Sequence, residues 1–228
     1  MSRGWLIVFG KAPRPGLVKT RMSPPLTLGQ ASDLYKAMLE DVLDASLRFA
    51  KELDLLPVLA FYPPDAAAEF SELAPPGYRL QIQHGADLAE RMANAFAEAA
   101  AAGAERILLR GSDSPALGQD VHEEALRGLD SGDDLVLTPD QNGGYALIAL
   151  RTSCPPVFKL PMSTDGVMEQ TLAAARDIDR RTSLTSSNFD VDTVGDFRCF
   201  DELSSAEELD LCPRTVESIS SAQMRGVL

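Results

Sequence analysis

Basic side chains are concentrated near the start of the chain, between residues 11 and 21. This stretch holds four positive charges, on Lys11, Arg14, Lys19 and Arg21, and no negative one. The remaining residues carry a net charge of −17, against −13 for the whole chain. Lysine and arginine neutralise phosphate oxygens at pH 7, and Gly16 permits close approach of the backbone, although neither a Walker A pattern nor G-x-G-x-x-G is present. We predict an anion or phosphate site here; the alternative is a basic surface loop that offsets acidic neighbours.

Two groups of carboxylates could hold a cation. Asp113 lies in Gly111–Pro115, directly after an apolar run, where a carboxylate beside a glycine turn suits a hard divalent ion that bridges phosphates. The alternative role for Asp113 is to cap the next helix. Asp190 and Asp192 lie two residues apart and share one face if the chain is extended, an arrangement that is costly unless a cation or hydrogen-bond donors separate them. The alternative there is an exposed acidic turn that caps a following helix.

A pair of glycines precedes the predicted strand at residues 145–150. Asn142, Gly143 and Gly144 either form a tight turn that a ligand can approach closely or make a plain hairpin turn. Both alternatives remain open from the sequence.

Strand-like and helix-like segments alternate along the chain and must position these residues. The predicted strands are residues 6–9, 55–62, 78–83, 106–110, 134–138 and 145–150. The predicted helices are residues 28–53, as one long or two short helices, and residues 88–102, 121–129 and 165–176. Such alternation predicts a mainly parallel sheet covered on both faces, in which the basic stretch follows the first strand and lies at the carboxyl edge, where open α/β folds bind ligands. We predict one domain over residues 1–228, with an acidic segment from about residue 197. Residues 201–210 carry five acids and no base and are expected to form the solvated face of a helix.

The composition excludes several classes of protein. A net charge of −13 argues against a general nucleic-acid or anionic-membrane binder, and no apolar run approaches the roughly 20 residues of a membrane span. The first apolar stretch is too short for a signal peptide, so we expect a cytoplasmic protein. Cys154, Cys199 and Cys212 are widely spaced and are expected to be free thiols. Two histidines and no G-x-S-x-G elbow make a serine hydrolase or a histidine-rich metal site a poor match.

Five short motifs occur in the order found in one group of bacterial proteins. They are Lys11-x-Pro13-x-x-Gly16-x-x-Lys19-Thr20-Arg21, Gly85-x-x-Leu88-x-x-Arg91-Met92, Gly111-Ser-Asp-Ser-Pro115, Asn142-Gly-Gly-Tyr145 and Asp190-x-Asp192-Thr193. As a set they resemble the poorly characterised bacterial glycosyltransferase A-type proteins, which are similar in fold to nucleotide-diphospho-sugar transferases. A more distant similarity is to the molybdenum-cofactor and phospholactate guanylyltransferases. The resemblance covers about residues 5 to 200, nearly the whole chain.

This resemblance implies a Rossmann-like three-layer α/β/α sandwich with a mainly parallel mixed sheet. It implies a nucleotide or phosphate site made of Lys11, Gly16, Lys19, Thr20, Arg21, Asn142, Gly143 and Gly144. It also implies that Asp113 coordinates Mg²⁺ or Mn²⁺ and that Asp192 completes the metal site, directly or through water. The chain departs from the family pattern at Asn142, where aspartate is usual, so hydrogen bonding is kept and a charge is lost.

The resulting expectation is a metal-dependent glycosyltransferase that uses a nucleotide-sugar donor and a small-molecule acceptor, with Asp190 as the candidate base for the acceptor hydroxyl. One alternative is a guanylyltransferase-like enzyme that transfers NMP from a nucleoside triphosphate to a small phosphorylated acceptor. A second alternative, favoured by Asn142, is a non-catalytic nucleotide-binding module.

Overall fold

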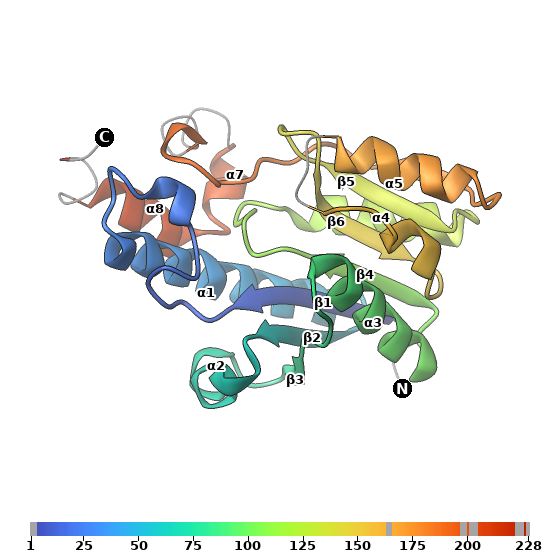
Figure 1. The fold of residues 1–228 in the computed structure, drawn as a ribbon, viewed down its shortest axis with the longest axis horizontal. Helices are drawn as coiled ribbons and strands as arrows, with labels where there is room; N and C mark the ends of the chain where they lie inside the picture. The colour runs from blue at the N-terminus through green and yellow to red at the C-terminus, as the bar shows by residue number, and fades with distance from the viewer. Residues whose placement is uncertain (1–3, 163–165, 197–199, 201–204, 222–225, 227–228) are drawn as a thin grey trace.

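The computed structural model describes residues 4–162, 166–196, 200, 205–221 and 226, and in this part of the chain one seven-stranded sheet forms the centre of the molecule (Figure 1). The strands are β1 (Gly4–Lys11), β2 (Leu55–Tyr62), β3 (Arg79–Ile82), β4 (Arg106–Arg110), β5 (Leu135–Pro139), β6 (Tyr145–Leu150) and β7 (Thr182–Leu184). Their order across the sheet is β3-β2-β1-β4-β6-β5-β7. Strand β6 runs antiparallel to β4 and β5, and the other neighbouring pairs are parallel. The predicted mainly parallel mixed sheet is therefore confirmed.

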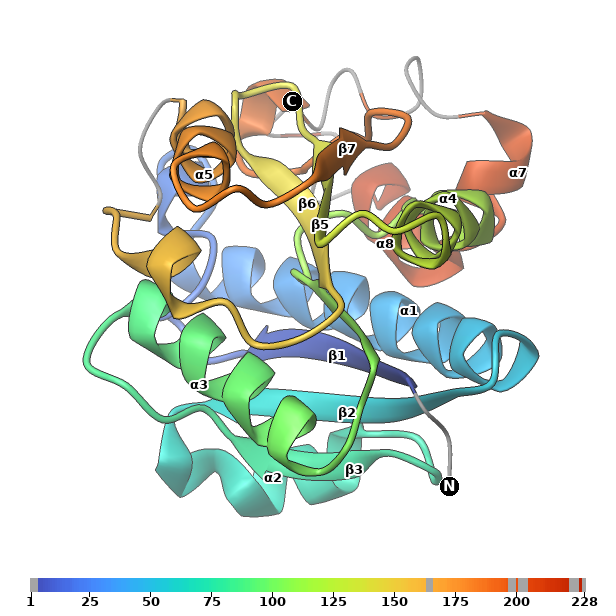
Figure 2. The ribbon, with the colours of Figure 1, turned by 90° about the vertical axis from the view of Figure 1, so that its right-hand side faces the viewer.

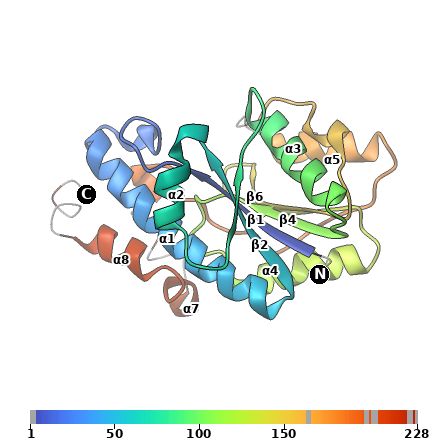
Figure 3. The ribbon, with the colours of Figure 1, turned by 90° about the horizontal axis from the view of Figure 1, so that it is seen from below.

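Helices cover both faces of this sheet (Figures 2 and 3). They are α1 (Leu28–Glu52), α2 (Ala67–Leu73), α3 (Leu88–Ala101), α4 (Gln119–Asp130), α5 (Val167–Arg176), α7 (Ala206–Leu209) and α8 (Pro213–Ser220). Helices α1, α2 and α4 pack on one face, and α3 and α5 pack on the other. Successive strand residues point to opposite faces, so Leu6 and Val8 face α1 while Trp5, Ile7 and Phe9 face α3. Strand β1 is apolar from Trp5 to Phe9 because both of its faces are covered there.

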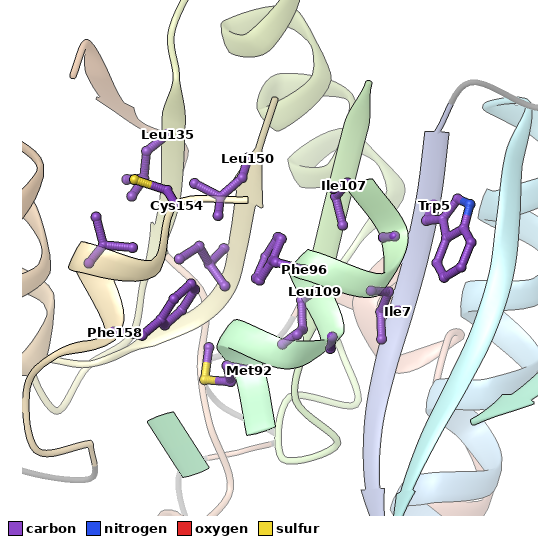
Figure 4. Packing of buried hydrophobic residues seen from close by; sticks show 14 of the residues in the cluster. Trp5, Ile7, Met92, Phe96, Ile107, Leu109, Leu135, Leu150, Cys154 and Phe158 are labelled. Atoms are coloured by element: carbon purple, nitrogen blue, oxygen red, sulfur yellow. The ribbon is translucent and has the colours of Figure 1, made fainter. Parts of the chain in front are cut away.

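The core under α3 shows how this packing is achieved (Figure 4). Phe96 of α3 is fully buried, and its ring stacks on Phe158 with the two centroids 5.5 Å apart. Ile107 and Leu109 of β4 belong to the same buried cluster. Burial of a large apolar side chain of this kind contributes about 1.5–3 kcal/mol, so this cluster stabilises the packing of α3 on the face of the sheet.

The order of the strands places a crevice at the carboxyl end of β1. The chain leaves β1 through α1 to reach β2 on one side, and it returns from β3 through α3 to β4 on the other side. This reversal between β1 and β4 is the point at which open α/β sheets bind ligands. Because β6 is antiparallel, it begins at the same edge, so the turn between β5 and β6 also lies there.

The predicted strands and long helices are confirmed within a few residues, with residues 28–53 forming a single helix. Among the strands and α-helices, α2, β7 and α8 were not predicted. The acidic segment includes α7, which is largely solvent-exposed, whereas residues 197–199 and 201–204 lie outside the described residues, as do Cys199 and the predicted helix start at Asp165. Cys154 is a buried free thiol, as expected. Among the helices that the structure describes, none combines the length and the apolar character of a membrane span.

Candidate functional site

A cleft of about 720 Å³ opens at the carboxyl edge of the sheet. Its walls come from the end of β1, the stretch at residues 17–21, the loop after β4, the β5–β6 turn and residues 190–193. A volume of this size lies within the range of about 300–1,000 Å³ that is typical of small-molecule sites. Segments far apart in the sequence therefore meet where the topology predicts a ligand.

Lys19 lies between Asp113 and Asp192, two of the three carboxylates that the sequence singled out. Its Nζ forms an ion pair with Asp113 and lies 3.0 Å from Asp192 Oδ1, and it donates a hydrogen bond of 2.7 Å to the carbonyl oxygen of Val191. Only 4% of the Lys19 side chain is exposed. Burial lowers the pKa of Lys19, but Asp113 and Asp192 raise it by more, so the net direction is upward and the ammonium is charged.

The backbone at Lys19 is held in an unusual conformation. Its φ of +47° lies in the left-handed region, which few residues other than glycine adopt. A short 3₁₀ turn at Thr20–Met22 follows, and the fully buried Met22 anchors that turn in the core. Such conformations persist only where the surroundings impose them, and they are common at functional sites.

The buried guanidinium of Arg110 holds the loop that carries Asp113. Arg110 is the last residue of β4 and is fully buried, and its guanidinium donates hydrogen bonds to the carbonyl oxygens of Ser114 and Gly111. Burial lowers the pKa of Arg110 to about 10, an effect that Tyr78 and Asp190 partly offset. Arg110 is therefore still charged at neutral pH and fixes the loop under the cleft.

Tyr35 of α1 connects the two loops that meet in the cleft. Its hydroxyl oxygen accepts a hydrogen bond of 2.9 Å from the Lys11 backbone N–H and lies 2.8 Å from Ser112 Oγ. Burial raises the pKa of Tyr35 to about 12, and the charge of Asp113 adds to this effect. The neutral hydroxyl thus links the end of β1 to the loop after β4.

Asp190 is tied to both neighbouring walls of the cleft. The Ser114 hydroxyl donates a hydrogen bond to Asp190 Oδ1. The side-chain amide of Gln141 donates to the Asp190 carbonyl oxygen at 2.6 Å and accepts from the Asp190 N–H at 2.9 Å, as a neighbouring strand would. Burial raises the pKa of Asp190 to about 7, although the Ser114 hydrogen bond opposes this shift.

The turn between β5 and β6 is organised around Asp140. Its Oδ1 accepts hydrogen bonds from the N–H groups of Asn142, at 2.7 Å, and Gly144, at 2.8 Å. A Cβ at Gly144 would lie 2.5 Å from Asp140 Oδ2, and Gly143 has a φ of +81°. Both glycines are therefore required by the turn, and Asn142 lines the cleft.

Most of the predicted site residues come together. Those that line the cleft are Lys11, Lys19, Thr20, Arg21, Asp113, Asn142, Gly144, Asp190 and Asp192. Gly16 and Gly143 shape turns beside the cleft and are not part of its lining. Arg14 does not line the cleft and forms ion pairs with Asp65 and Glu69.

Several site residues were given no role by the sequence reasoning, although three of them lie in motifs that it quoted. They are Tyr35, Ser112, Ser114, Asp140, Gln141 and Arg91, whose guanidinium lies 3.8 Å from the centroid of the Tyr62 ring. The position of Asp140 immediately before the Gln-Asn-Gly-Gly turn was a usable signal, because aspartate commonly accepts hydrogen bonds from backbone groups two residues further on.

The two carboxylates suit a magnesium or manganese ion only in part. Mg²⁺ is commonly held by one or two carboxylates together with substrate phosphates, and Asp113 and Asp192 supply such a pair. Within the described residues, no group of three or more His, Cys, Asp or Glu side chains is arranged to hold a metal. The pair therefore fits a metal that is bound together with a phosphate-bearing substrate.

Comparisons with known proteins agree with this fold. A family model described as an uncharacterized protein conserved in bacteria, DUF2064, matches residues 46–164, more than half of the chain. No curated protein matches the sequence. A solved structure from Desulfovibrio desulfuricans G20, described provisionally as a nucleotide-diphospho-sugar transferase, is 28% identical with a TM-score of 0.88, over 100% of this chain and 99% of that one.

More distant structures share the fold alone. A cytidylyltransferase from Leptospira borgpetersenii is 13% identical with a TM-score of 0.58, over 100% of this chain and 97% of that one. The 4-diphosphocytidyl-2C-methyl-D-erythritol synthase from Anaerococcus prevotii is 11% identical with a TM-score of 0.56, over 85% and 93% of the two chains.

Proposed function

Because this chain belongs to the DUF2064 family and has a charged cleft at the switch point of its sheet, we propose that it is a transferase acting on a nucleotide-activated substrate. The observation that carries this proposal is the meeting of Lys11, Lys19 and Arg21 with Asp113 and Asp192 in one cleft. Cations in such a place bind phosphates, and carboxylates beside them hold a divalent ion that bridges phosphates.

Within this class we propose glycosyl transfer from a nucleotide sugar to the hydroxyl of a small acceptor. The likeness to the provisionally described nucleotide-diphospho-sugar transferase, over nearly the full length of both chains, supports this choice. In the reaction the bond between the anomeric carbon and the phosphate oxygen breaks, and a bond to the acceptor oxygen forms. The leaving nucleoside diphosphate keeps the electron pair.

The residues of the chain have separate tasks in this proposal. Lys11, Lys19 and Arg21 neutralise the diphosphate and the charge that develops on the leaving group, which lowers the barrier by electrostatic stabilisation. Asp190, held by Ser114 and Gln141, takes the proton of the acceptor hydroxyl. Mg²⁺ or Mn²⁺, held by Asp113 and Asp192, would supply further charge neutralisation at the phosphates.

Replacement of Asp113 tests this proposal. Asp113→Asn keeps the size of the side chain and removes its charge, so we expect turnover of a nucleotide sugar, followed as release of nucleoside diphosphate, to fall at least 100-fold. Asp177→Asn is the matched control, because it makes the same change at an exposed position on the far end of α5. Full activity of Asp113→Asn would overturn the role of Asp113. Release of pyrophosphate from a nucleoside triphosphate, with no release from nucleotide sugars, would instead establish nucleotidyl transfer.

A further inference from the structure

The ammonium of Lys19 already uses its full hydrogen-bonding capacity. Its three N–H groups have three oxygen partners, on Asp113, Asp192 and the Val191 carbonyl. The side chain is almost completely buried, while the Asp113 and Asp192 side chains are 43% and 32% exposed. Lys19 therefore occupies the space between the two carboxylates, and the carboxylates remain reachable from the cleft.

The charges of Asp113 and Asp192 are matched by two nearby cations. Lys19 contributes one positive charge, and Arg21 adds a second at 3.9 Å from Asp192 Oδ2. These two charges offset the two carboxylates. A divalent ion bound by the same carboxylates would lie beside the Lys19 ammonium, and like charges in close contact in a partly buried site repel strongly.

Phosphate groups remove this conflict. A nucleoside diphosphate supplies negative charge and acceptor oxygens, which can take over the hydrogen bonds of the Lys19 ammonium. Lysine suits such an exchange because its charge sits on a flexible four-carbon stem. Once Lys19 turns to the phosphate, Asp113 and Asp192 are free to bind a cation.

We propose that Lys19 makes metal and nucleotide binding interdependent, by withholding Asp113 and Asp192 from a divalent cation until the phosphates of a nucleotide take its ammonium. This inference rests on the proposed function. Each ligand then tightens the binding of the other by the same factor, as thermodynamic linkage requires. The free protein avoids loading a metal that has no substrate to act on.

Binding of Mn²⁺ alone to the full-length protein tests this inference without measuring activity. The free Mn²⁺ concentration is followed by electron paramagnetic resonance in titrations of the wild type, Lys19→Met and Lys11→Met. We expect Lys19→Met to bind Mn²⁺ at least tenfold more tightly than the wild type, a difference of about 1.4 kcal/mol or more. Lys11→Met removes the same charge from the rim of the same cleft, and we expect a change of less than threefold.

Two further variants locate the effect. Adding Asp113→Asn to Lys19→Met should abolish the gain, because one of the two carboxylates is lost. Lys19→Gln keeps a donor for the Val191 carbonyl and should behave like Lys19→Met. It also provides a second folded protein if Lys19→Met is unstable.

The possible outcomes separate this inference from the proposed function. Equal Mn²⁺ affinity of the wild type and both Lys19 variants would overturn the inference and leave the metal site intact. No binding to any variant at millimolar Mn²⁺ would overturn the inference together with the metal assignment. If Lys19→Met gains Mn²⁺ affinity while no nucleotide or nucleotide sugar binds the wild type, the competition is established and the proposed function fails.

Discussion

At the scale of single residues, the position of Lys19 explains why only part of the basic stretch belongs to the site. Lys19 and Arg14 lie five residues apart, yet Lys19 is buried between carboxylates of the cleft and Arg14 pairs with Asp65 and Glu69. The charges of both were visible in the sequence. Their partners, which are remote in the chain, were not.

The contrast between these two residues gives a matched pair of variants. We expect Lys19→Ala to weaken the binding of the nucleotide by about 1.5–3 kcal/mol, the value of a hydrogen bond to a charged group. Arg14→Ala removes the same charge from the same loop, and it should change the affinity by less than a factor of three. Isothermal titration calorimetry with the best-binding nucleotide measures both. Equal losses in the two variants would mean that the loop acts only through its overall charge.

His122 of α4 makes the stability of the protein depend on pH. Its ring is fully buried against Phe49, with Nδ1 2.7 Å from the Gly118 carbonyl oxygen. Burial, aided by the charge of Arg110, lowers the pKa of His122 to about 3. The folded state therefore resists protonation of this ring, and stability that is present above the ordinary pKa of 6.5 is lost as the pH falls below it.

Replacement of His122 measures this effect. His122→Asn keeps a donor for the Gly118 carbonyl oxygen and cannot titrate. Between pH 8 and pH 5 we expect the free energy of unfolding of the wild type to fall by about 2 kcal/mol more than that of the variant. Urea denaturation at the two pH values provides the comparison. A stability difference between the two proteins that does not change with pH would contradict a neutral buried His122.

At the scale of elements, the strands were predictable because their physical signal is local. The strands over residues 6–9, 55–62 and 106–110 appear in the sequence as apolar runs, since both faces of the sheet are covered. The antiparallel direction of β6 also had a local signal, and it agrees with the hairpin turn that the sequence left open at residues 142–144. Only a few residues separate β5 from β6, too few for the crossover that a parallel pair requires.

The missed elements depend on distant contacts. Helix α8 begins where the fully buried Asp41 of α1 accepts hydrogen bonds from the Thr215 N–H, at 2.7 Å, and from the Thr215 hydroxyl, at 2.8 Å. This pairing spans 174 residues of the chain and leaves no local pattern. The same reason applies to the contact of Gln141 with Asp190, which the sequence could not indicate.

The Gln141 side chain holds the segment at residues 190–192 against the β5–β6 turn, and this gives a prediction at the level of elements. In Gln141→Ala the Asp190 N–H loses its acceptor, so its hydrogen exchange should become about fivefold faster, as expected for the loss of a hydrogen bond of about 1 kcal/mol. The Val191 N–H, which donates to the Asp113 carbonyl oxygen at 2.9 Å, is an internal reference. Exchange measured by NMR would contradict the role of Gln141 if the Asp190 amide were unaffected.

At the scale of the whole molecule, the charge distribution makes the cleft the part of the surface that attracts anions. The chain carries a net charge of −13, and a nucleotide is repelled by most of the surface. The cations of the cleft lie at the switch point of the sheet, above a base of buried apolar side chains. The fold could be predicted from patterning, whereas the coupling of Lys19 to two carboxylates required the three-dimensional arrangement.

A nucleotide-activated substrate that binds in this cleft should stabilise the folded protein against heat. The most direct measurement is the thermal stability of the purified protein, with and without Mn²⁺, across nucleoside triphosphates and nucleotide sugars. A ligand at about 100 times its dissociation constant adds about 2.7 kcal/mol, which should raise the Tm by roughly 5–10 °C for a chain of this length. We expect such a shift with a nucleotide sugar and a larger one when Mn²⁺ is present. If no nucleotide or nucleotide sugar raised the Tm, this result would contradict nucleotide binding in the cleft.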